Sequence, residues 1–101
     1  MLRVTPIRHE RATTLKLEGS LSGPWVDVLR KCWAELAEAH TPVDVDLRGL
    51  NFLDSSGAAL LLDMERSGFR NFGSSAFIND VLYCEKILLN PWPNKLTARG
   101  N

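Results

Sequence analysis

Cysteine and histidine are scarce in this chain of 101 residues, which contains two of each. Cys32 and Cys84 form no C-x-x-C pair, and with only His9 and His40 available they do not complete a recognisable zinc site. The pattern also excludes a disulfide framework. It is typical of a protein that is kept in a reducing compartment.

Long apolar runs are missing as well. The longest continuous one, Ala58 to Leu62, is far shorter than the roughly 20 residues that cross a bilayer. The sequence as far as Glu10 contains no apolar core of a signal peptide. We therefore expect a cytoplasmic protein without direct membrane insertion.

Neither sign of charge is in excess, because 12 Lys and Arg balance 12 Asp and Glu. Such a chain creates no long-range field that would attract nucleic acid or an anionic membrane. The phosphate-binding pattern G-x-x-x-x-G-K-[ST] is also absent, so the sequence gives no support for nucleotide binding. We predict no cofactor, no metal site and no nucleic-acid partner.

The composition that remains is that of one ordinary domain, with 45% hydrophobic and 24% charged residues. A chain of this length buries roughly two thirds of the surface that its unfolded state exposes, which is enough for one core. We assign residues 1–90 to this domain. Because prolines flank Trp92 and cannot continue a helix, residues 91–101 are predicted to form a loosely ordered tail.

Periodicity predicts the order of the secondary-structure elements. Alternating apolar and polar residues indicate strands over 2–7 and 13–18, paired as a hairpin, and over 43–47 before a turn at 49–53. A short strand is expected over 69–72. Strand pairs that alternate with helices predict an α/β domain in which helices flank a mixed sheet of four to five strands.

Three helices are expected between and after these strands. The first begins after a cap at Ser22 and carries an apolar stripe made of Trp25, Val28, Leu29, Cys32, Trp33 and Leu36. The second begins at the polar cluster at 54–57 and ends at 67–68. The third begins after Ser75 and is predicted to turn four side chains inward, namely Phe77, Val81, Leu82 and Cys84.

The most informative segment runs from Val43 to Gly57 and comprises a strand, a turn and a helix that opens with Asp54-Ser55-Ser56-Gly57. In open α/β sheets, ligands and partners usually bind at the carboxyl ends of strands, where helix N-termini point. The helix N-terminus would stabilise a phosphate on a hydroxyl there by roughly 0.3–1 kcal/mol. Asp and Ser are also among the best N-caps, so capping alone accounts for the same residues.

Three segments resemble the STAS family, the anti-sigma factor antagonists and their relatives. They are Leu15-Lys-Leu-Glu-Gly19, Val43-Asp-Val-Asp-Leu-Arg-Gly49 and Phe52-Leu-Asp-Ser-Ser-Gly57. The third is the specific one, because a hydrophobic-Asp-Ser-Ser/Thr-Gly loop between a strand and a helix identifies single-domain antagonists. The chain departs from the family pattern at residues 19–22, which lack the usual acids, and at 69–75, which lack the usual apolar strand.

The resemblance implies a bacterial regulator of transcription that acts by protein–protein binding and has no catalytic residues. Ser55, directly after Asp54, would be phosphorylated by a partner kinase that is also an anti-sigma factor, and a phosphatase would be a further partner. Asp54, Ser55, Ser56 and Gly57 would form the partner-binding loop. A phosphate there would oppose docking while the helix terminus accommodates its charge. Ser55→Asp should therefore weaken partner binding and leave the melting temperature nearly unchanged.

Two other functions stay open at this point. In an enzyme, residues 53–57 would act as a nucleophile elbow, but the first glycine of G-x-S-x-G is missing and His40 lies roughly 23 Å from Ser55 along an extended strand. His9, in a polar turn, is expected to be solvated.

In a constitutive subunit of a lipid-transport ATPase or stress-signalling scaffold complex, the same loop would dock without being phosphorylated. Trp25 and Trp92 would then be exposed anchors for the partner. In the alternative, Trp25 packs on the sheet and Trp92 pins the tail.

Overall fold

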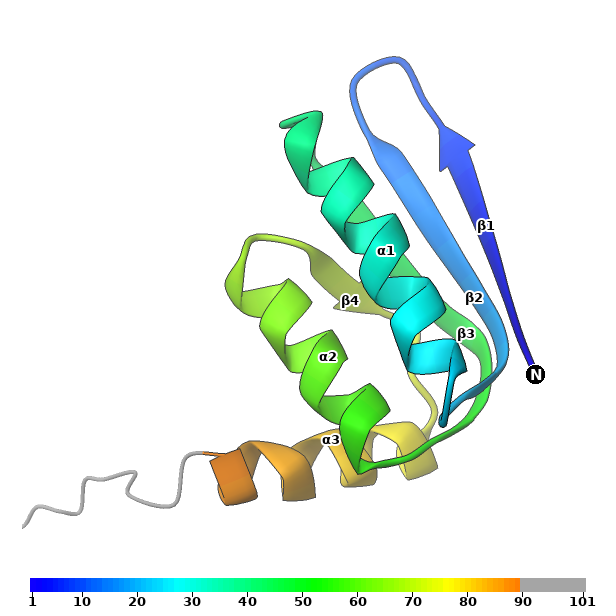
Figure 1. The fold of residues 1–101 in the computed structure, drawn as a ribbon, viewed down its shortest axis with the longest axis vertical. Helices are drawn as coiled ribbons and strands as arrows, with labels where there is room; N and C mark the ends of the chain where they lie inside the picture. Colours follow the sequence, from blue (N-terminus) through cyan, green and yellow to red (C-terminus); the bar gives the residue numbers. More distant parts are fainter. Residues whose placement is uncertain (90–101) are drawn as a thin grey trace, which may run out of the picture.

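The computed structural model describes residues 1–89, which form a four-stranded sheet and three helices (Figure 1). In chain order the elements are β1 (Leu2–Arg8), β2 (Thr13–Leu21), α1 (Trp25–Glu38), β3 (Val43–Leu53), α2 (Ser55–Arg66), β4 (Arg70–Phe72) and α3 (Ala76–Leu89). The strand order is β1-β2-β3-β4; β1 is antiparallel to β2, and the other neighbouring pairs are parallel. The predicted α/β class with a mixed sheet is confirmed, whereas the predicted tail at 91–101 and Trp92 lie outside the described residues.

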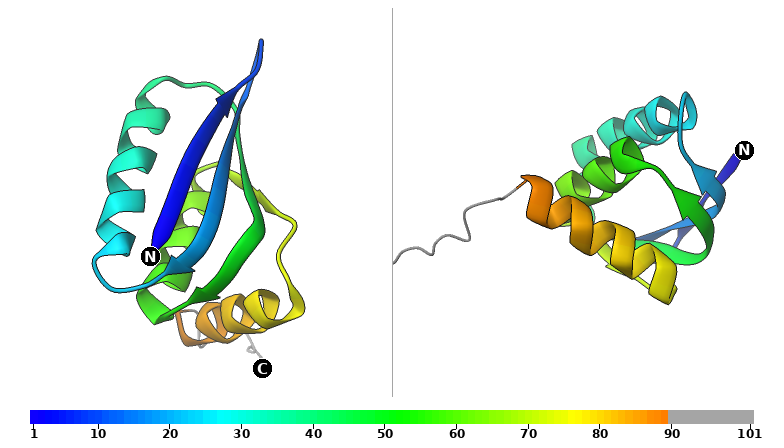
Figure 2. Two further views of the ribbon diagram at one scale, coloured as in Figure 1. Left: turned by 90° about the vertical axis from the view of Figure 1, so that its right-hand side faces the viewer. Right: turned by 90° about the horizontal axis from the view of Figure 1, so that it is seen from below.

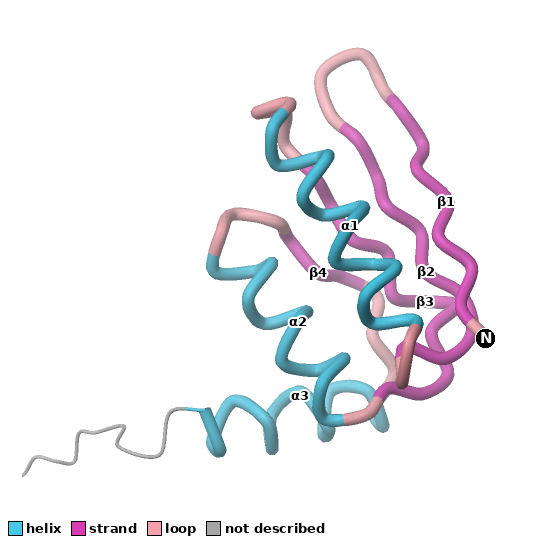
Figure 3. The backbone as a smooth tube through the Cα atoms, viewed as in Figure 1, coloured by secondary structure: helices cyan, strands magenta, loops and turns pink. Residues whose placement is uncertain are grey.

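Helices α1 and α2 lie side by side on one face of the sheet, and α3 crosses beneath its end (Figure 1 and Figure 2). Helix α3 packs against both α2 and β3. The short loop between β3 and α2 lies at the same end of the molecule as α3 (Figure 3). Three elements therefore meet around the predicted site. No helix within residues 1–89 is both long enough and apolar enough to cross a membrane.

The hydrophobic core fills the space between the sheet and the helices. Its largest fully buried side chains are Leu15, Leu17, Leu21, Leu29, Val43, Val45, Leu47, Leu53, Leu60, Leu61, Met64 and Ile78. Most of them come from the two central strands and α2, because the central strands are covered by helices on this face. Burial of each such side chain stabilises the fold by roughly 1.5–3 kcal/mol.

Helix α1 differs from its prediction in two respects. Its buried face is rotated, since Val26 is 4% exposed and Val28 is 42% exposed. Its N-cap residue is Pro24, without a side-chain capping hydrogen bond, so the predicted cap at Ser22 is wrong. Trp25 is partly buried and packs against the core. The structure therefore supports its packing role and not the role of an exposed anchor.

Strands β2 and β3 both run further than the sequence predicts. β2 continues past Gly19 to Leu21, and β3 passes through the predicted turn at Gly49 and reaches Leu53. Pairing between the two strands provides hydrogen-bond partners for the backbone N–H and C=O groups of this segment, which a turn would otherwise have to satisfy. Two register shifts in the ladder accommodate the irregular apolar pattern. The extension places Leu21 beside Leu53, at the edge from which α2 starts.

Helix α3 presents a different face to the core than the sequence predicts. Phe77 is 48% exposed and Cys84 is exposed, so their predicted inward orientation is wrong. Ile78 is fully buried instead, and Glu85 is only 8% exposed. Apolar residues occur on most sides of this helix, so periodicity alone does not define its inner face.

Asp46 on β3 is a buried carboxylate that Arg48 covers. Asp46 is 3% exposed, and the Arg48 guanidinium donates to its two oxygens at 3.0 and 2.9 Å. The backbone amide of Arg48 adds a third hydrogen bond at 3.0 Å. The guanidinium also lies 5.7 Å from the centroid of the Phe72 ring. Hydrogen bonding to Arg48 lowers the pKa of Asp46 below its ordinary value of 3.8.

We expect Asp46→Asn to make the stability of the protein less sensitive to acid. Because the pKa of Asp46 is lower in the folded state than in the unfolded chain, its contribution is complete above about pH 4 and is lost as the pH falls further. Urea unfolding between pH 2 and pH 6 would show a shallower loss of stability below pH 4 in the variant. Asp44→Asn is the control, because the Asp44–Arg70 pair is more exposed and screened by water. Equal acid sensitivity of Asp46→Asn and the wild type would contradict this account.

Candidate functional site

Asp54 holds the junction between β3 and α2 together. It is the N-cap of α2, and its Oδ1 atom accepts a hydrogen bond from the Gly57 amide at 2.8 Å. Its Oδ2 atom accepts another from the Gly23 amide, 3.1 Å away in the turn after β2. The Asp54 amide itself donates to the Leu21 carbonyl at 3.2 Å. The predicted capping role is confirmed, and the same residue also ties the loop to the end of β2.

Gly57 is buried and allows α2 to approach β2 closely. A Cβ atom at this position would lie 2.4 Å from the Leu21 carbonyl oxygen and 2.9 Å from Leu21 Cγ. Any side chain would therefore push the start of α2 away from the strand. In the predicted partner-binding loop, Gly57 sets the backbone position from beneath the surface and offers no side chain to a partner.

Ser55 and Ser56 are both exposed, as the sequence predicts. Ser55 is the first residue of α2, where the positive end of the helix dipole lies. Its Oγ atom donates a hydrogen bond of 2.6 Å to Oε1 of Glu85 on α3. The candidate phosphoacceptor is thus at the surface, and its hydroxyl is held by a carboxylate from another helix.

Glu85 is the site residue that sequence reasoning missed. It is 8% exposed, although a carboxylate is rarely buried without a partner. The Ser55 hydroxyl supplies that partner. One signal was available in the sequence: Glu85 is an acid within the apolar stretch of 81–89 and lies two helical turns after Ile78. Without the fold, nothing indicated that this acid faces the start of α2.

An exposed aromatic pair flanks the same end of the domain. Phe52, near the end of β3, stacks on Phe77 of α3 with ring centroids 6.1 Å apart and an interplanar angle of 22°. The two residues are 45% and 48% exposed. Such a pair contributes roughly 0.5–1.5 kcal/mol beyond its area burial, so it helps to hold the start of α3 against β3.

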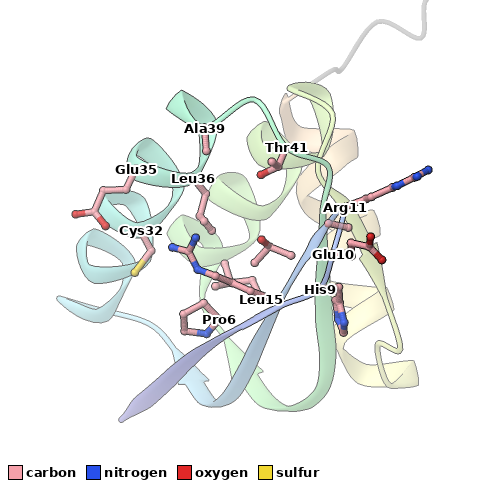
Figure 4. Close-up of a pocket in the computed structure, with 13 residues that line it drawn as sticks. Pro6, His9, Glu10, Arg11, Leu15, Cys32, Glu35, Leu36, Ala39 and Thr41 are labelled. Carbon is pink, nitrogen blue, oxygen red and sulfur yellow. The ribbon is translucent and has the colours of Figure 1, made fainter.

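A hollow of about 360 Å³ lies between α1 and the β1–β2 hairpin, at the opposite end of the sheet (Figure 4). His9 on its rim shares a hydrogen bond of 3.1 Å with the Thr14 hydroxyl. Burial raises the pKa of the Cys32 thiol, and Glu35 adds to the effect, which disfavours the reactive thiolate. Glu35 and Arg11 extend away from the hollow (Figure 4). Its lining side chains do not converge on a reaction centre.

Neither histidine can act as a base for Ser55. His9 and His40 precede the starts of β2 and β3, which pair with each other, whereas Ser55 follows the far end of β3. β3 has 11 residues, and at about 3.3 Å per residue its ends lie roughly 30 Å apart. The geometry therefore excludes the hydrolase alternative in which a histidine activates Ser55.

Comparison with known proteins agrees with this architecture. The family model described as "Mlab, STAS domain" matches residues 5–71. The chain belongs to the STAS family. The matched residues of this STAS domain include β2, β3, α2 and the loop from Asp54 to Gly57, so the resemblance is confirmed. The match ends before α3, so Glu85 lies outside it.

Two solved structures are similar in fold to this STAS domain. The anti-sigma factor antagonist SpoIIAA in its unphosphorylated form is 20% identical with a TM-score of 0.64, and the alignment covers 82% of each chain. The crystal structure of a protein named Mglu is 17% identical with a TM-score of 0.56. The alignment covers 66% of this chain and 18% of the Mglu chain. At these identities the likeness shows the fold. None of the curated proteins compared with this STAS domain matches it significantly.

Proposed function

We propose that this STAS domain is an anti-sigma factor antagonist-like regulator that binds a protein partner through the surface around Ser55. Phosphorylation of Ser55 by a partner that is both serine kinase and anti-sigma factor would switch this binding, and a phosphatase would reset it. The observation that carries the proposal is the surface position of Ser55, the first residue of α2, directly after the capping Asp54. The likeness to the antagonist SpoIIAA supports it.

The physical basis of the switch is electrostatic. A phosphate adds about −1.5 to −2 charges at neutral pH beside the Asp54 carboxylate. A partner surface that fits the uncharged hydroxyl would have to desolvate this charge without compensating it, which opposes association. The backbone of the loop is fixed by Asp54 and Gly57, so a phosphate would change the charge at Ser55 without moving the loop itself.

Incubation with the candidate anti-sigma kinase and ATP tests the proposal directly. Mass spectrometry should map one added phosphate to Ser55 in the wild type. Ser55→Ala should remove the modification, whereas Ser56→Ala, one residue along the same exposed turn, should retain it. Phosphate on Ser56 alone, or none in a kinase preparation that modifies other substrates, would overturn the proposed switch.

We expect Ser55→Asp to weaken binding to the unphosphorylated partner by about tenfold or more, which corresponds to roughly 1.4 kcal/mol. Titration calorimetry with the purified partner would measure the change. Ser56→Asp carries the same charge one residue further along and serves as the matched control, with a smaller effect. Tight binding of the Ser55→Asp variant would show that charge at this position does not control docking.

One observation favours a second function, that of a constitutive subunit of a lipid-transport ATPase or scaffold complex. The Ser55 hydroxyl is already engaged by Glu85 on its own chain, as a purely structural serine would be. In that case the domain would copurify with an ATPase or scaffold, and Ser55 would carry no phosphate in either the free or the bound form.

A further inference from the structure

We propose that Glu85 couples the charge at Ser55 to the docking of α3: the uncharged hydroxyl holds α3 in place, and a phosphate on Ser55 drives the Glu85 segment away. This inference rests on the proposed function, because it takes Ser55 as the residue that receives the phosphate. It deepens that function by giving the modification an effect on this chain's own fold as well as on its partner.

The contact between the two residues depends on the hydroxyl proton. Ser55 Oγ donates to Glu85 Oε1 at 2.6 Å, and Glu85 is 8% exposed. A hydrogen bond to a charged acceptor contributes more than one between neutral groups, and a buried carboxylate that loses its donor is destabilised. The hydroxyl therefore compensates for burying the Glu85 charge.

Phosphorylation reverses the sign of this contact. The Ser55 oxygen forms a bond to the γ-phosphorus of ATP, the bond from that phosphorus to the bridging oxygen breaks, and ADP leaves while the hydroxyl proton passes to solvent. The oxygen that faced Glu85 then has no hydrogen to donate and carries an anionic group. A phosphate on this oxygen would place a second negative charge next to the Glu85 carboxylate, which is itself largely removed from water, and like charges so close repel each other.

Helix α3 is the element that yields, because α2 is held more firmly. The start of α2 is fixed by the two hydrogen bonds of Asp54, and its buried residues are Gly57, Ala58, Leu60, Leu61, Leu62 and Met64. Over residues 76–88 of α3, only Ile78 and Glu85 are buried, and the core contacts of Val81 and Leu82 leave these residues partly exposed. Helix α3 also lies as a separate layer across the end of the domain (Figure 2).

Movement of α3 would change the surface next to the phosphate. The Phe52–Phe77 stack joins β3 to α3 and would be strained or broken as α3 moves. The side chains of α2 and β3 that α3 now covers would become accessible. Phosphorylated and unphosphorylated forms would thus differ in surface shape as well as in charge, which gives a partner two features to distinguish.

The presence of Glu85 also changes an expectation drawn from the sequence. The sequence predicts that a negative charge at Ser55 leaves the melting temperature nearly unchanged, because the helix terminus accommodates it. With a buried carboxylate 2.6 Å from the hydroxyl, we instead expect the charge to lower the melting temperature. The favourable dipole contribution at the start of α2 offsets only part of the repulsion.

A double-mutant cycle tests this coupling without any partner. Wild type, Ser55→Asp, Glu85→Gln and the double variant would be compared by thermal melting and by amide hydrogen exchange of residues 81–88. Ser55→Asp should lower the melting temperature by about 5 °C and speed α3 exchange about tenfold or more. Glu85→Gln should lower the melting temperature when the serine is present and raise it in the Ser55→Asp background, because the Gln amide can donate to a carboxylate.

This change of sign separates coupling from a merely structural role, which would give Glu85→Gln the same effect in both backgrounds. Ser56→Asp is the control for charge at the start of α2 and should leave α3 exchange unchanged. Equal melting and equal α3 exchange in Ser55→Asp and the double variant would overturn the proposal. If Ser55→Asp fails to fold, recovery of folding by Glu85→Gln supports it and failure to recover overturns it. Whether Ser55 is phosphorylated is decided separately by the mass spectrometry above.

Discussion

Ile78→Ala is expected to lower the free energy of unfolding by about 2–5 kcal/mol, the range for removing a fully buried branched side chain and leaving a cavity. Ile78 is 0% exposed and is the large apolar side chain by which α3 is anchored in the core. Its loss should also loosen the hold of Glu85 on Ser55, since both depend on α3 being docked. Urea unfolding at neutral pH would measure the stability change, and hydrogen exchange would locate it.

The same helix provides a matched control. Ile87→Ala makes the same chemical change at a residue that is 49% exposed, so we expect a much smaller loss of stability. The loss in Ile78→Ala should be accompanied by faster exchange throughout α3. If the two variants had the same stability, α3 would not be anchored through Ile78 and its proposed coupling to Ser55 would lose its structural basis.

Gly57→Val is expected to destabilise the domain by about 3 kcal/mol. A Cβ atom at Gly57 would approach the backbone oxygen of Leu21 to 2.4 Å, and a backbone atom can yield only if the strand or the helix shifts. The shift would pull Asp54 away from Gly23 and break the hydrogen bond between the loop and the turn after β2. The position of Ser55 would change with it, so partner binding should fall along with stability.

Ser56→Val separates this steric effect from helix propensity. It introduces the same β-branched side chain one residue earlier in α2, at an exposed position and without the clash. By helix propensity alone neither change should cost much stability, because Val ranks close to Ser and above Gly. Thermal or urea unfolding of the two variants gives the comparison. Equal stability of Gly57→Val and Ser56→Val would mean that α2 and β2 are not in the close contact described here.

The candidate site therefore consists of two parts that differ in how they could be predicted. Asp54, Ser55 and Gly57 could be placed from the sequence because a helix start is a local feature: the cap, the surface serine and the small residue lie within four positions of one another. Glu85 lies 30 positions from Ser55 in the chain. No local rule connects two residues at that separation, so only the packing of α3 across the end of the sheet brings them together.

The errors in the fold have the same origin. The irregular apolar pattern of residues 49–53 predicts a turn, yet these residues pair with β2 through a ladder that contains register shifts. The pattern also predicts Phe77 and Cys84 on the inner face of α3, because apolar residues surround much of that helix. The inner face is chosen instead by the fit of Ile78 against the core.

The sequence alone determined the α/β class, the mixed sheet, the N-cap of α2 at Asp54 and the exposure of Ser55, because periodicity, capping and the family's loop motif act over short stretches of chain. Tertiary structure alone decided how far β2 and β3 extend, which face of α3 is buried and that Glu85 holds the Ser55 hydroxyl. These features depend on hydrogen bonds and packing between distant segments. Such contacts exist only once the chain has folded.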